Sequence, residues 1–353
     1  MQVRTVWSQS GFARGSFLLM CPVLGFVVSA CAPHCFAQGA VVFVGSGSTV
    51  PAPLYSKWSD EYNKRSPAFQ MRYLPVGTSE GIAQISRGVG DFAAGEAPLT
   101  AKQRADGGLI EVPTILIAIV PIYNLPGVSG QLHLSGAVLA DIFLGRIQTW
   151  RSASIVQLNP QLALPDLPIK VIYRPAGKGS NYVFSEFLSK SSVRFKAQVG
   201  TSPSPEWPVG SVAERSSDMA ERVIREPGSI GFVEAQYAAR MNVAQAAVLN
   251  PAGRFVKASG KTLAAACLAV EAPGFDRLSA SLINAPGAES YPITSFSWLY
   301  LRTASPETRR AKHLADCLNW MLSSGQQVVS EEGYAALPTP LLAKVKAKVD
   351  SLQ

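Results

Sequence analysis

Short apolar runs alternate with helical patterns along most of the chain. Runs such as VVFV at 41–44 and GSIGFV at 228–233 have the length and composition of buried strands. Between them, apolar residues recur at the three- and four-residue spacing of amphipathic helices. The pattern predicts strands at 41–44, 69–74, 111–123, 169–173, 228–233 and 297–301, and helices at 54–64, 81–87, 137–144, 182–190, 216–225, 262–270 and 306–323.

This repeated order of strand and helix is typical of α/β proteins, in which helices cover sheets. The apolar segment VPTILIAIVPIY at 112–123 is short for a membrane span and is punctuated by prolines. We therefore expect an α/β fold in which this segment is a buried strand.

The N-terminus has the organisation of a secretory signal peptide. Arg4 and Arg14 precede an apolar stretch at 16–30, and small residues follow in CAPHCFAQG. Cleavage after Ala37 is the preferred interpretation. A second interpretation stays open, because the residues before Cys31 resemble a lipoprotein cleavage box that would leave Cys31 lipidated. Both interpretations predict a secreted protein.

Composition narrows the range of functions. The chain has 353 residues, 47% of them hydrophobic, which is enough for two packed domains. Its formal charge of +8 is scattered and forms no basic block with interleaved aromatics, so we do not expect nucleic-acid binding. A mildly basic surface suits an anionic ligand. His133 and His313 lack metal-ligand spacing, and we expect no metal or other cofactor. Cys267 and Cys317 could form a disulfide or remain two buried thiols.

Three glycine turns with hydroxyl side chains each end a strand and open a helix. They are GSGST at 45–49, GTSEG at 77–81 and RPAGKGSNY at 174–182. The start of a helix offers unpaired N–H groups and partial positive charge, and glycine lets the backbone approach a ligand. One such turn is usually plain helix capping. Three in one chain predict a pocket for a small anion.

Longer motifs containing these turns resemble a known family. GSGSTVPAPLYSKW, GTSEGIAQISRGVGDFAAGEAPL, DIFLGRIQTW, YRPAGKGSNYVFSEFL and PGSIGFVEAQYA occur in this order. Together they resemble the PstS-type periplasmic phosphate-binding proteins of bacterial phosphate ABC importers, from about residue 41 to about 345. The resemblance implies a type II periplasmic binding protein fold. Two α/β lobes, each a mixed sheet flanked by helices, would be joined by two hinge strands, with phosphate bound between them.

The resemblance also implies domain boundaries and partners. The signal peptide would occupy 1–37, lobe one 40–116 and 294–345, and lobe two 117–293. The chain would cross between lobes in the segment from 113 onward and again at 291–295. The protein would be a periplasmic monomer that captures inorganic phosphate and delivers it to a membrane ABC permease complex, without enzymatic chemistry.

The family's ligand positions can be carried over residue by residue. Thr49 and the N–H of Val50 match contacts of the first turn, and Thr78 matches a serine that donates its hydroxyl and N–H. Arg174 matches the cationic ligand. The resemblance also assigns donor roles to Gly179 and Ser180 at the start of the third helix.

Three positions depart from the family pattern. Glu96 stands where the family has an aspartate that accepts the proton of bound phosphate. Lys178 replaces a serine that donates its hydroxyl, and its ammonium has three possible places: the pocket, an ion pair with Glu96, or solvent. Ala176 replaces an aspartate that holds the arginine, so Arg174 would be freer or restrained by Glu96. These departures leave arsenate or a phosphonate as alternative ligands.

A secreted phosphatase-like enzyme is the competing hypothesis from another class. Ser46, Ser48 and Ser79 are conceivable nucleophiles, but a secreted hydrolase would also need a histidine and an acid. Asp91 lies close to Glu96 in sequence, although an acid and base pair would need a shared cleft. The motifs therefore favour a binding protein.

Overall fold

The computed structural model describes residues 40–270, 280–303 and 308–350. The predicted signal peptide, the cleavage position after Ala37 and the alternative lipid site at Cys31 lie outside these residues. The described residues all belong to one compact unit of the chain, Gly39–Gln353.

The first part of the chain alternates strands and helices, as the sequence pattern predicts. Its elements are β1 (Val41–Gly47), α1 (Ala52–Arg65), β2 (Phe69–Leu74), α2 (Thr78–Ser86), β3 (Phe92–Gly95), α3 (Ala101–Gly107) and β4 (Leu109–Tyr123). Strand β1 pairs in parallel with both β2 and β3, which brings the carboxyl ends of these strands to one edge of the sheet.

The remainder of the chain supplies further strands and most of the helices. Its elements are β5 (His133–Leu134), α4 (Gly136–Phe143), α5 (Ala153–Leu158), β6 (Lys170–Tyr173), α6 (Gly179–Ser191), α7 (Val193–Gln198), β7 (Ser211–Val212), α8 (Ser216–Arg225), β8 (Ser229–Glu234), α9 (Ala235–Arg240), β9 (Ala247–Leu249), β10 (Phe255–Val256), α10 (Gly260–Val270), β11 (Thr294–Arg302), α11 (Thr308–Met321), the 3-10 helix η1 (Ser324–Val328) and α12 (Thr339–Asp350).

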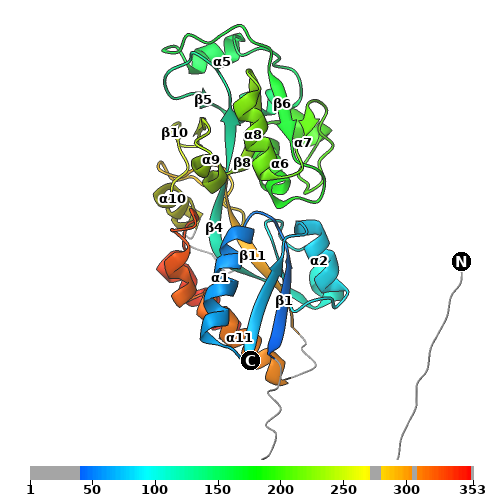
Figure 1. Cartoon of the computed structure of the whole chain (residues 1–353). Helices are drawn as coiled ribbons and strands as arrows, with labels where there is room; N and C mark the ends of the chain where they lie inside the picture. Colours follow the sequence, from blue (N-terminus) through cyan, green and yellow to red (C-terminus); the bar gives the residue numbers. More distant parts are fainter. Residues whose placement is uncertain (1–39, 271–279, 304–307, 351–353) are drawn as a thin grey trace, which may run out of the picture. The chain divides into compact units, whose positions relative to one another are not determined.

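One mixed sheet runs through both halves of the molecule. Its strand order is β2-β1-β3-β11-β4-β8-β6-β7, and β10-β9-β5 form a separate small sheet. Strand β4 pairs antiparallel with β11 from Leu109 to Ala118 and with β8 from Ile119 to Tyr123. It therefore belongs to both halves, and Figure 1 shows it running from the group of α1, α2 and β11 to the group of α8, β8 and β6.

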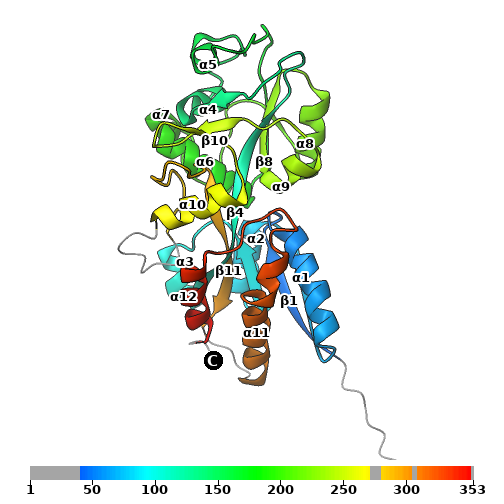
Figure 2. The same cartoon turned by 90° about the vertical axis from the view of Figure 1, so that its left-hand side faces the viewer.

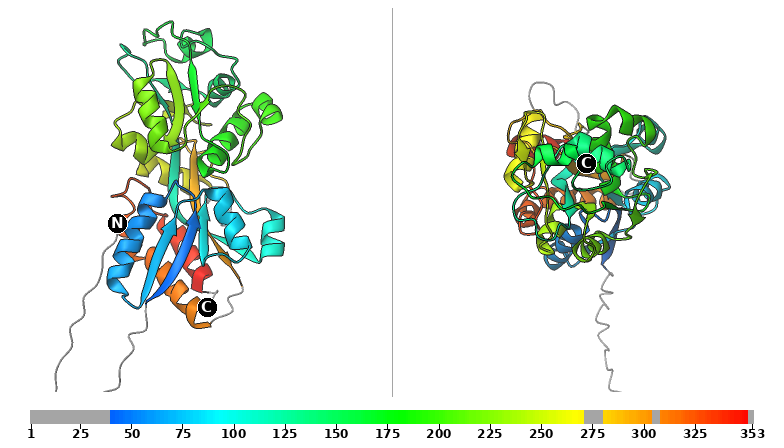
Figure 3. Two further views of the ribbon diagram at one scale, coloured as in Figure 1. Left: turned by 45° about the vertical axis from the view of Figure 1, so that its right-hand side comes forward. Right: turned by 90° about the horizontal axis from the view of Figure 1, so that it is seen from above.

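The second connection between the halves lies beside the first. Tyr291 donates its hydroxyl to the carbonyl of Ile119 at 2.9 Å, and the Ile119 N–H donates to the carbonyl of Ile293 at 3.2 Å. Strand β11 then continues antiparallel to β4, and Figure 3 shows the two strands together at the centre of the molecule. The prediction of an α/β fold with two lobes and two connecting strands is confirmed.

Strand β4 is also the centre of the hydrophobic core. Every residue from Glu111 to Tyr123 is buried, because helices and neighbouring strands cover it on all sides. Figure 2 shows α1, α11 and α12 around β1 and β11 in one lobe, and α4, α6 and α8 around β8 in the other. The predicted buried strand at 112–123 is confirmed.

The glycine turns end their strands and begin their helices as expected. Gly47 has φ of 138°, and a Cβ built on it would lie 2.1 Å from the carbonyl oxygen of Ala94, so only glycine fits. Pro51 caps α1, and Pro53 stands in its first turn, where N–H groups need no helical partner. Helices α2 and α6 begin at Thr78 and Gly179, three residues earlier than their apolar patterns predict.

Candidate functional site

The carboxylate of Glu96 is the centre of a network of buried hydroxyl groups. Glu96 directly follows β3 and has no exposed surface. Its Oε2 accepts from the hydroxyls of Ser48 at 2.5 Å and Thr78 at 3.2 Å, and its Oε1 accepts from Ser297 at 2.9 Å. Three segments far apart in sequence therefore meet at this carboxylate.

Burial has a large effect on this group. Removal from water raises the pKa of Glu96 from 4.5 to about 7, although the hydrogen bonds from Ser48, Ser297 and Thr78 act in the opposite direction. Near neutral pH the side chain is therefore divided between its acceptor form and a protonated form that can also donate.

The N-termini of α2 and α6 meet beside Glu96. The N–H of Ser79 donates to the carbonyl of Gly177 at 3.2 Å, which joins the two lobes directly. A Cβ built on Gly179 would lie 1.8 Å from Glu96 Oε2 and 2.7 Å from Thr78 Oγ1. The missing side chain of Gly179 thus allows the start of α6 to approach the carboxylate.

The turn between β1 and α1 supplies the third part of the site. The N–H of Val50 donates to Ser48 Oγ at 3.0 Å, and Ser48 in turn donates to Glu96. The carbonyl of Val50 accepts from the hydroxyl of Tyr334 at 2.7 Å and from Gln236 Nε2 at 3.4 Å. Ser48, rather than the neighbouring Thr49, therefore connects this turn to Glu96.

Arg174 is buried and held by the start of α8. It is 2% exposed, its Nη1 donates to the hydroxyl of Ser216, and its Nη2 donates to the carbonyl of Glu214 at 3.1 Å. Its Nε has no hydrogen-bond partner in the described part of the chain. Burial lowers the pKa of Arg174, and the charge of Glu234 opposes this effect most strongly. Ser216 and Glu214 thus restrain the arginine, which the sequence left either freer or held by Glu96.

Lys178 lies at the same junction, with its side chain turned toward α2. Its Nζ is 3.6 Å from a Cβ built on Gly77, and the residue is partly buried. Among the described residues it makes no ion pair, so the pairing with Glu96, one of the three places that the sequence left open for its ammonium, is not formed. Burial lowers its pKa, and the nearby charge of Arg174 lowers it further. Its N–H already donates to the carbonyl of Pro203 at 3.1 Å.

Ser180 and Asn181 complete the first turn of α6. Ser180 is 1% exposed, and its Oγ has no partner among the described residues. Asn181 holds the preceding turn in place, because its Nδ2 donates to the carbonyls of Arg174, Pro175 and Pro203. The structure thus gathers Ser48, Thr78, Gly179 and Ser297 around the carboxylate of Glu96, and it fixes Arg174 on the neighbouring edge of lobe two.

Comparison with known proteins agrees with this architecture. The profile of the PBP superfamily domain matches residues 36–324. The chain is 34% identical to the phosphate-binding protein PstS of Pasteurella multocida, over 88% of this chain and 90% of that protein. It is 33% identical to the phosphate-binding protein PstS of Xylella fastidiosa (strain 9a5c), over 87% and 85%. The chain belongs to the PstS family.

A solved structure supports the fold of this PstS-family chain. A putative phosphate ABC transporter substrate-binding protein with bound phosphate from Clostridium perfringens has a TM-score of 0.61 at 18% identity. The match covers 84% of this chain and 100% of that one. At this identity the likeness concerns the fold alone.

Several other candidates from the sequence have structural roles in this PstS-family chain. Asp91 accepts from both Arg310 Nε and Arg310 Nη2, at 2.7 and 2.8 Å, and from the N–H of Val44. It therefore fixes β1 and α11 rather than facing Glu96. His133 stacks on Phe255 with a centroid distance of 4.2 Å.

Metal ligands and cysteines offer no second site in the described residues. No group of three or more His, Cys, Asp or Glu side chains there could hold a metal ion. Cys267 and Cys317 are buried, and no disulfide joins them. Burial raises the pKa of the Cys317 thiol to about 12, which makes it unreactive.

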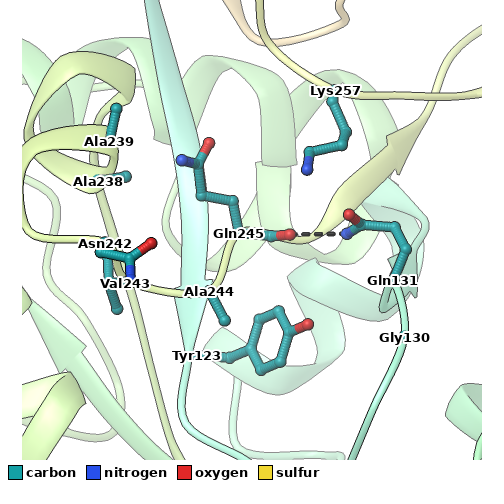
Figure 4. Close-up of a pocket in the computed structure, with 10 residues that line it drawn as sticks. All are labelled: Tyr123, Gly130, Gln131, Ala238, Ala239, Asn242, Val243, Ala244, Gln245 and Lys257. Atoms are coloured by element: carbon teal, nitrogen blue, oxygen red, sulfur yellow. Dashed lines mark hydrogen bonds between the residues drawn. The ribbon is translucent and has the colours of Figure 1, made fainter.

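A separate pocket of about 420 Å³ opens beside the end of β4 (Figure 4). Tyr123, Gln131, Gln245 and Lys257 are among its lining residues, and Gln131 Nε2 donates to the carbonyl of Gln245 at 2.7 Å. It contains none of the ligand residues that the sequence predicts. Among the helices that the structure describes, every one is too short or too polar to span a bilayer.

Proposed function

We propose that this chain captures inorganic phosphate between its lobes and delivers it to a membrane ABC permease complex. The observation that carries the proposal is the position of Glu96, buried where the starts of α2 and α6 meet. A buried carboxylate repels a fully ionised anion such as sulfate and accepts a hydrogen bond from a protonated phosphate oxygen. The names of the PstS relatives support the same ligand.

Each predicted ligand residue has a role in this proposal. Backbone and hydroxyl groups of the three helix starts donate to the phosphate oxygens, while Arg174 and Lys178 supply positive charge. A phosphate oxygen would accept the hydrogen bond that the Val50 N–H donates to Ser48 Oγ in the structure. The proposed ligand residues are Thr49, Val50, Thr78, Glu96, Arg174, Lys178, Gly179 and Ser180.

The proposal includes an organisation and a location for the protein. Lobe one comprises 40–116 and 294–345, and lobe two comprises 117–293, with closure of the lobes excluding water from the anion. The protein is a periplasmic monomer, released by cleavage after Ala37 or anchored through a lipid on Cys31. The relatives are binding proteins, and we infer that this chain likewise performs no covalent chemistry.

Isothermal titration of the mature protein, stripped of phosphate, tests the proposal. Phosphate should bind and sulfate should give no heat between pH 5 and pH 8.5, and Glu96→Gln should weaken the exclusion of sulfate. The control is Glu61→Gln, which removes a surface carboxylate of α1 that pairs with Lys57. Absence of phosphate binding at every pH would refute the proposal.

A second candidate ligand and a second function have their own tests. The longer side chain of Glu96 and the ammonium of Lys178 favour arsenate or a phosphonate as the alternative ligand. Titration tests this alternative, which requires that one of these anions bind more tightly than phosphate. A phosphatase assay with and without divalent metals tests the enzymatic alternative, which requires catalytic turnover of a phosphate ester.

A further inference from the structure

Glu234 is a buried carboxylate that the family resemblance does not assign. It ends β8 and caps α9, and it has no exposed surface. Neither carboxylate oxygen has a hydrogen-bond partner in the described part of the chain. Leaving an unpaired carboxylate buried is strongly unfavourable, so this arrangement requires a reason.

The sheet places Glu234 beside Arg174. Strands β6 and β8 are parallel neighbours, paired through Lys170 with Ser229 and Val171 with Ile230. Their carboxyl ends therefore reach the same edge of the sheet. Arg174 follows the last residue of β6, and Glu234 is the last residue of β8.

The helix after Glu234 reaches the opposite lobe. Gln236 in α9 donates to the carbonyl of Val50, in the turn that also carries Ser48. Glu234, at the end of β8, pairs with Ile119 of β4. At this point β4 changes its pairing partner from β11 to β8. Glu234 is thus flanked by the arginine of one lobe and the first anion-binding turn of the other.

Unpaired donors accompany these unpaired acceptors. Arg174 Nε and Ser180 Oγ are buried and have no partner among the described residues. A protonated oxyanion complements this set, because it accepts from Arg174 and Ser180 through its ionised oxygens and donates an O–H to Glu234. A fully ionised oxyanion would leave Glu234 unpaired and repelled.

Within the described part of the chain, the charged and titratable groups that act on Glu234 come from four segments. They are Glu96 after β3, Arg174 after β6, Tyr237 in α9 and Tyr334 after η1. Two buried carboxylates thus face two cations, the buried guanidinium of Arg174 and the partly buried ammonium of Lys178. A ligand with one negative charge and two O–H groups matches this balance better than a dianion with one O–H group.

We propose that Glu234 is a second specificity carboxylate, which pairs with the second O–H of a dihydrogen phosphate monoanion while Glu96 accepts the first. The inference rests on the proposed function, since it concerns the same anion. It predicts that the site takes phosphate with two protons, even above the pH at which the dianion dominates in solution.

Phosphorus-31 NMR of the bound ligand at pH 8 tests this directly in the wild-type protein. The bound phosphate should show the chemical shift of the monoanion, measured against free phosphate titrated in the same buffer. A bound signal with the shift of the dianion would overturn the inference and leave the proposed function intact. Absence of any bound signal and of any heat of binding would instead remove the proposed function.

Isothermal titration of variants supplies the second arm. Above neutral pH the affinity of the wild type for total phosphate should fall roughly tenfold per pH unit, because the monoanion's share of total phosphate falls by the same factor. In Glu234→Gln the amide can also donate to a dianion, so the affinity for total phosphate should change less than about threefold per pH unit. Parallel pH profiles for the two proteins would contradict the proposal.

Two further variants separate charge from folding. Glu221→Gln removes an exposed carboxylate of α8 and should keep the wild-type pH profile. Glu234→Asp retains the charge and should keep the steep pH dependence, even with weaker binding. The NMR result on the wild type decides the question if Glu234→Gln does not fold.

Discussion

The unusual feature of Glu96 is the direction of its pKa shift. Carboxylates in ion pairs titrate below their ordinary range, whereas burial raises the pKa of Glu96 from 4.5 to about 7. The three hydroxyl donors around it, from Ser48, Thr78 and Ser297, reduce this effect without cancelling it. The group therefore changes protonation near neutral pH.

This shift predicts a pH dependence of stability. The folded protein binds the Glu96 proton more tightly than the unfolded chain, so the contribution is full below pH ~4.5 and is lost as the pH rises through about 7. The loss amounts to about 3 kcal/mol of unfolding free energy. Urea unfolding without phosphate should show wild type losing this amount relative to Glu96→Gln between pH 5 and pH 8.

A surface variant provides the control for the urea unfolding experiment. Glu61→Gln, on the surface of α1, should follow the wild-type curve. If wild type and Glu96→Gln give parallel curves of stability against pH, Glu96 does not titrate in this range.

Single residues were predictable only where a local motif marked them. Thr78 and Gly179 stand in glycine turns and Glu96 stands in a family motif, and the structure brings the three together. Ser297 and Glu234 stand in buried strands, where the apolar pattern gives a polar residue no local signature. Their importance depends on which strands become neighbours, and that information is not contained in a short window of sequence.

At the scale of helices and strands, the apolar pattern located most elements but not their first turns. Helices α2 and α6 begin with polar and glycine residues that carry no apolar period, so the pattern starts three residues late. Short elements such as β3, α3 and α9 were not predicted, because a few residues are too few to show a period. The missed first turns are the parts of α2 and α6 that meet at Glu96.

The close approach of α6 to Glu96 predicts a strong effect of Gly179→Ala. The added Cβ would lie 1.8 Å from Glu96 Oε2, so either the carboxylate or the start of α6 must move. We expect phosphate affinity to fall roughly 5- to 150-fold, the range given by 1–3 kcal/mol of overpacking. Titration calorimetry at pH 7 measures the change.

A matched glycine provides the comparison for this variant. Gly260 begins α10, and a Cβ built there meets no atom within 4 Å. Gly260→Ala should therefore bind phosphate as the wild type does. Equal affinities for the two alanine variants would mean that α6 and Glu96 do not approach each other in the binding state.

At the scale of the whole molecule, β4 makes the two lobes dependent on each other. The alternation of strands and helices was sufficient to predict the α/β class, because it is repeated along the chain. The change of partner within β4, between Ala118 and Ile119, could not be predicted, since it follows from pairing with β11 and β8, which lie more than a hundred residues away. Bonds such as that from Ser79 to Gly177 add direct contact between the lobes.

A shared strand and a shared ligand predict one cooperative unfolding transition. Because β4 is buried in both halves of the sheet, neither half can lose it and stay intact. If phosphate binds between the lobes as proposed, phosphate at 100 times its Kd should stabilise the whole unit by about 2.7 kcal/mol. Far-ultraviolet circular dichroism and tryptophan fluorescence should give coincident curves that shift together, with sulfate at equal ionic strength as the control. Two separate transitions, of which phosphate moves only one, would show that the ligand is held by a single lobe.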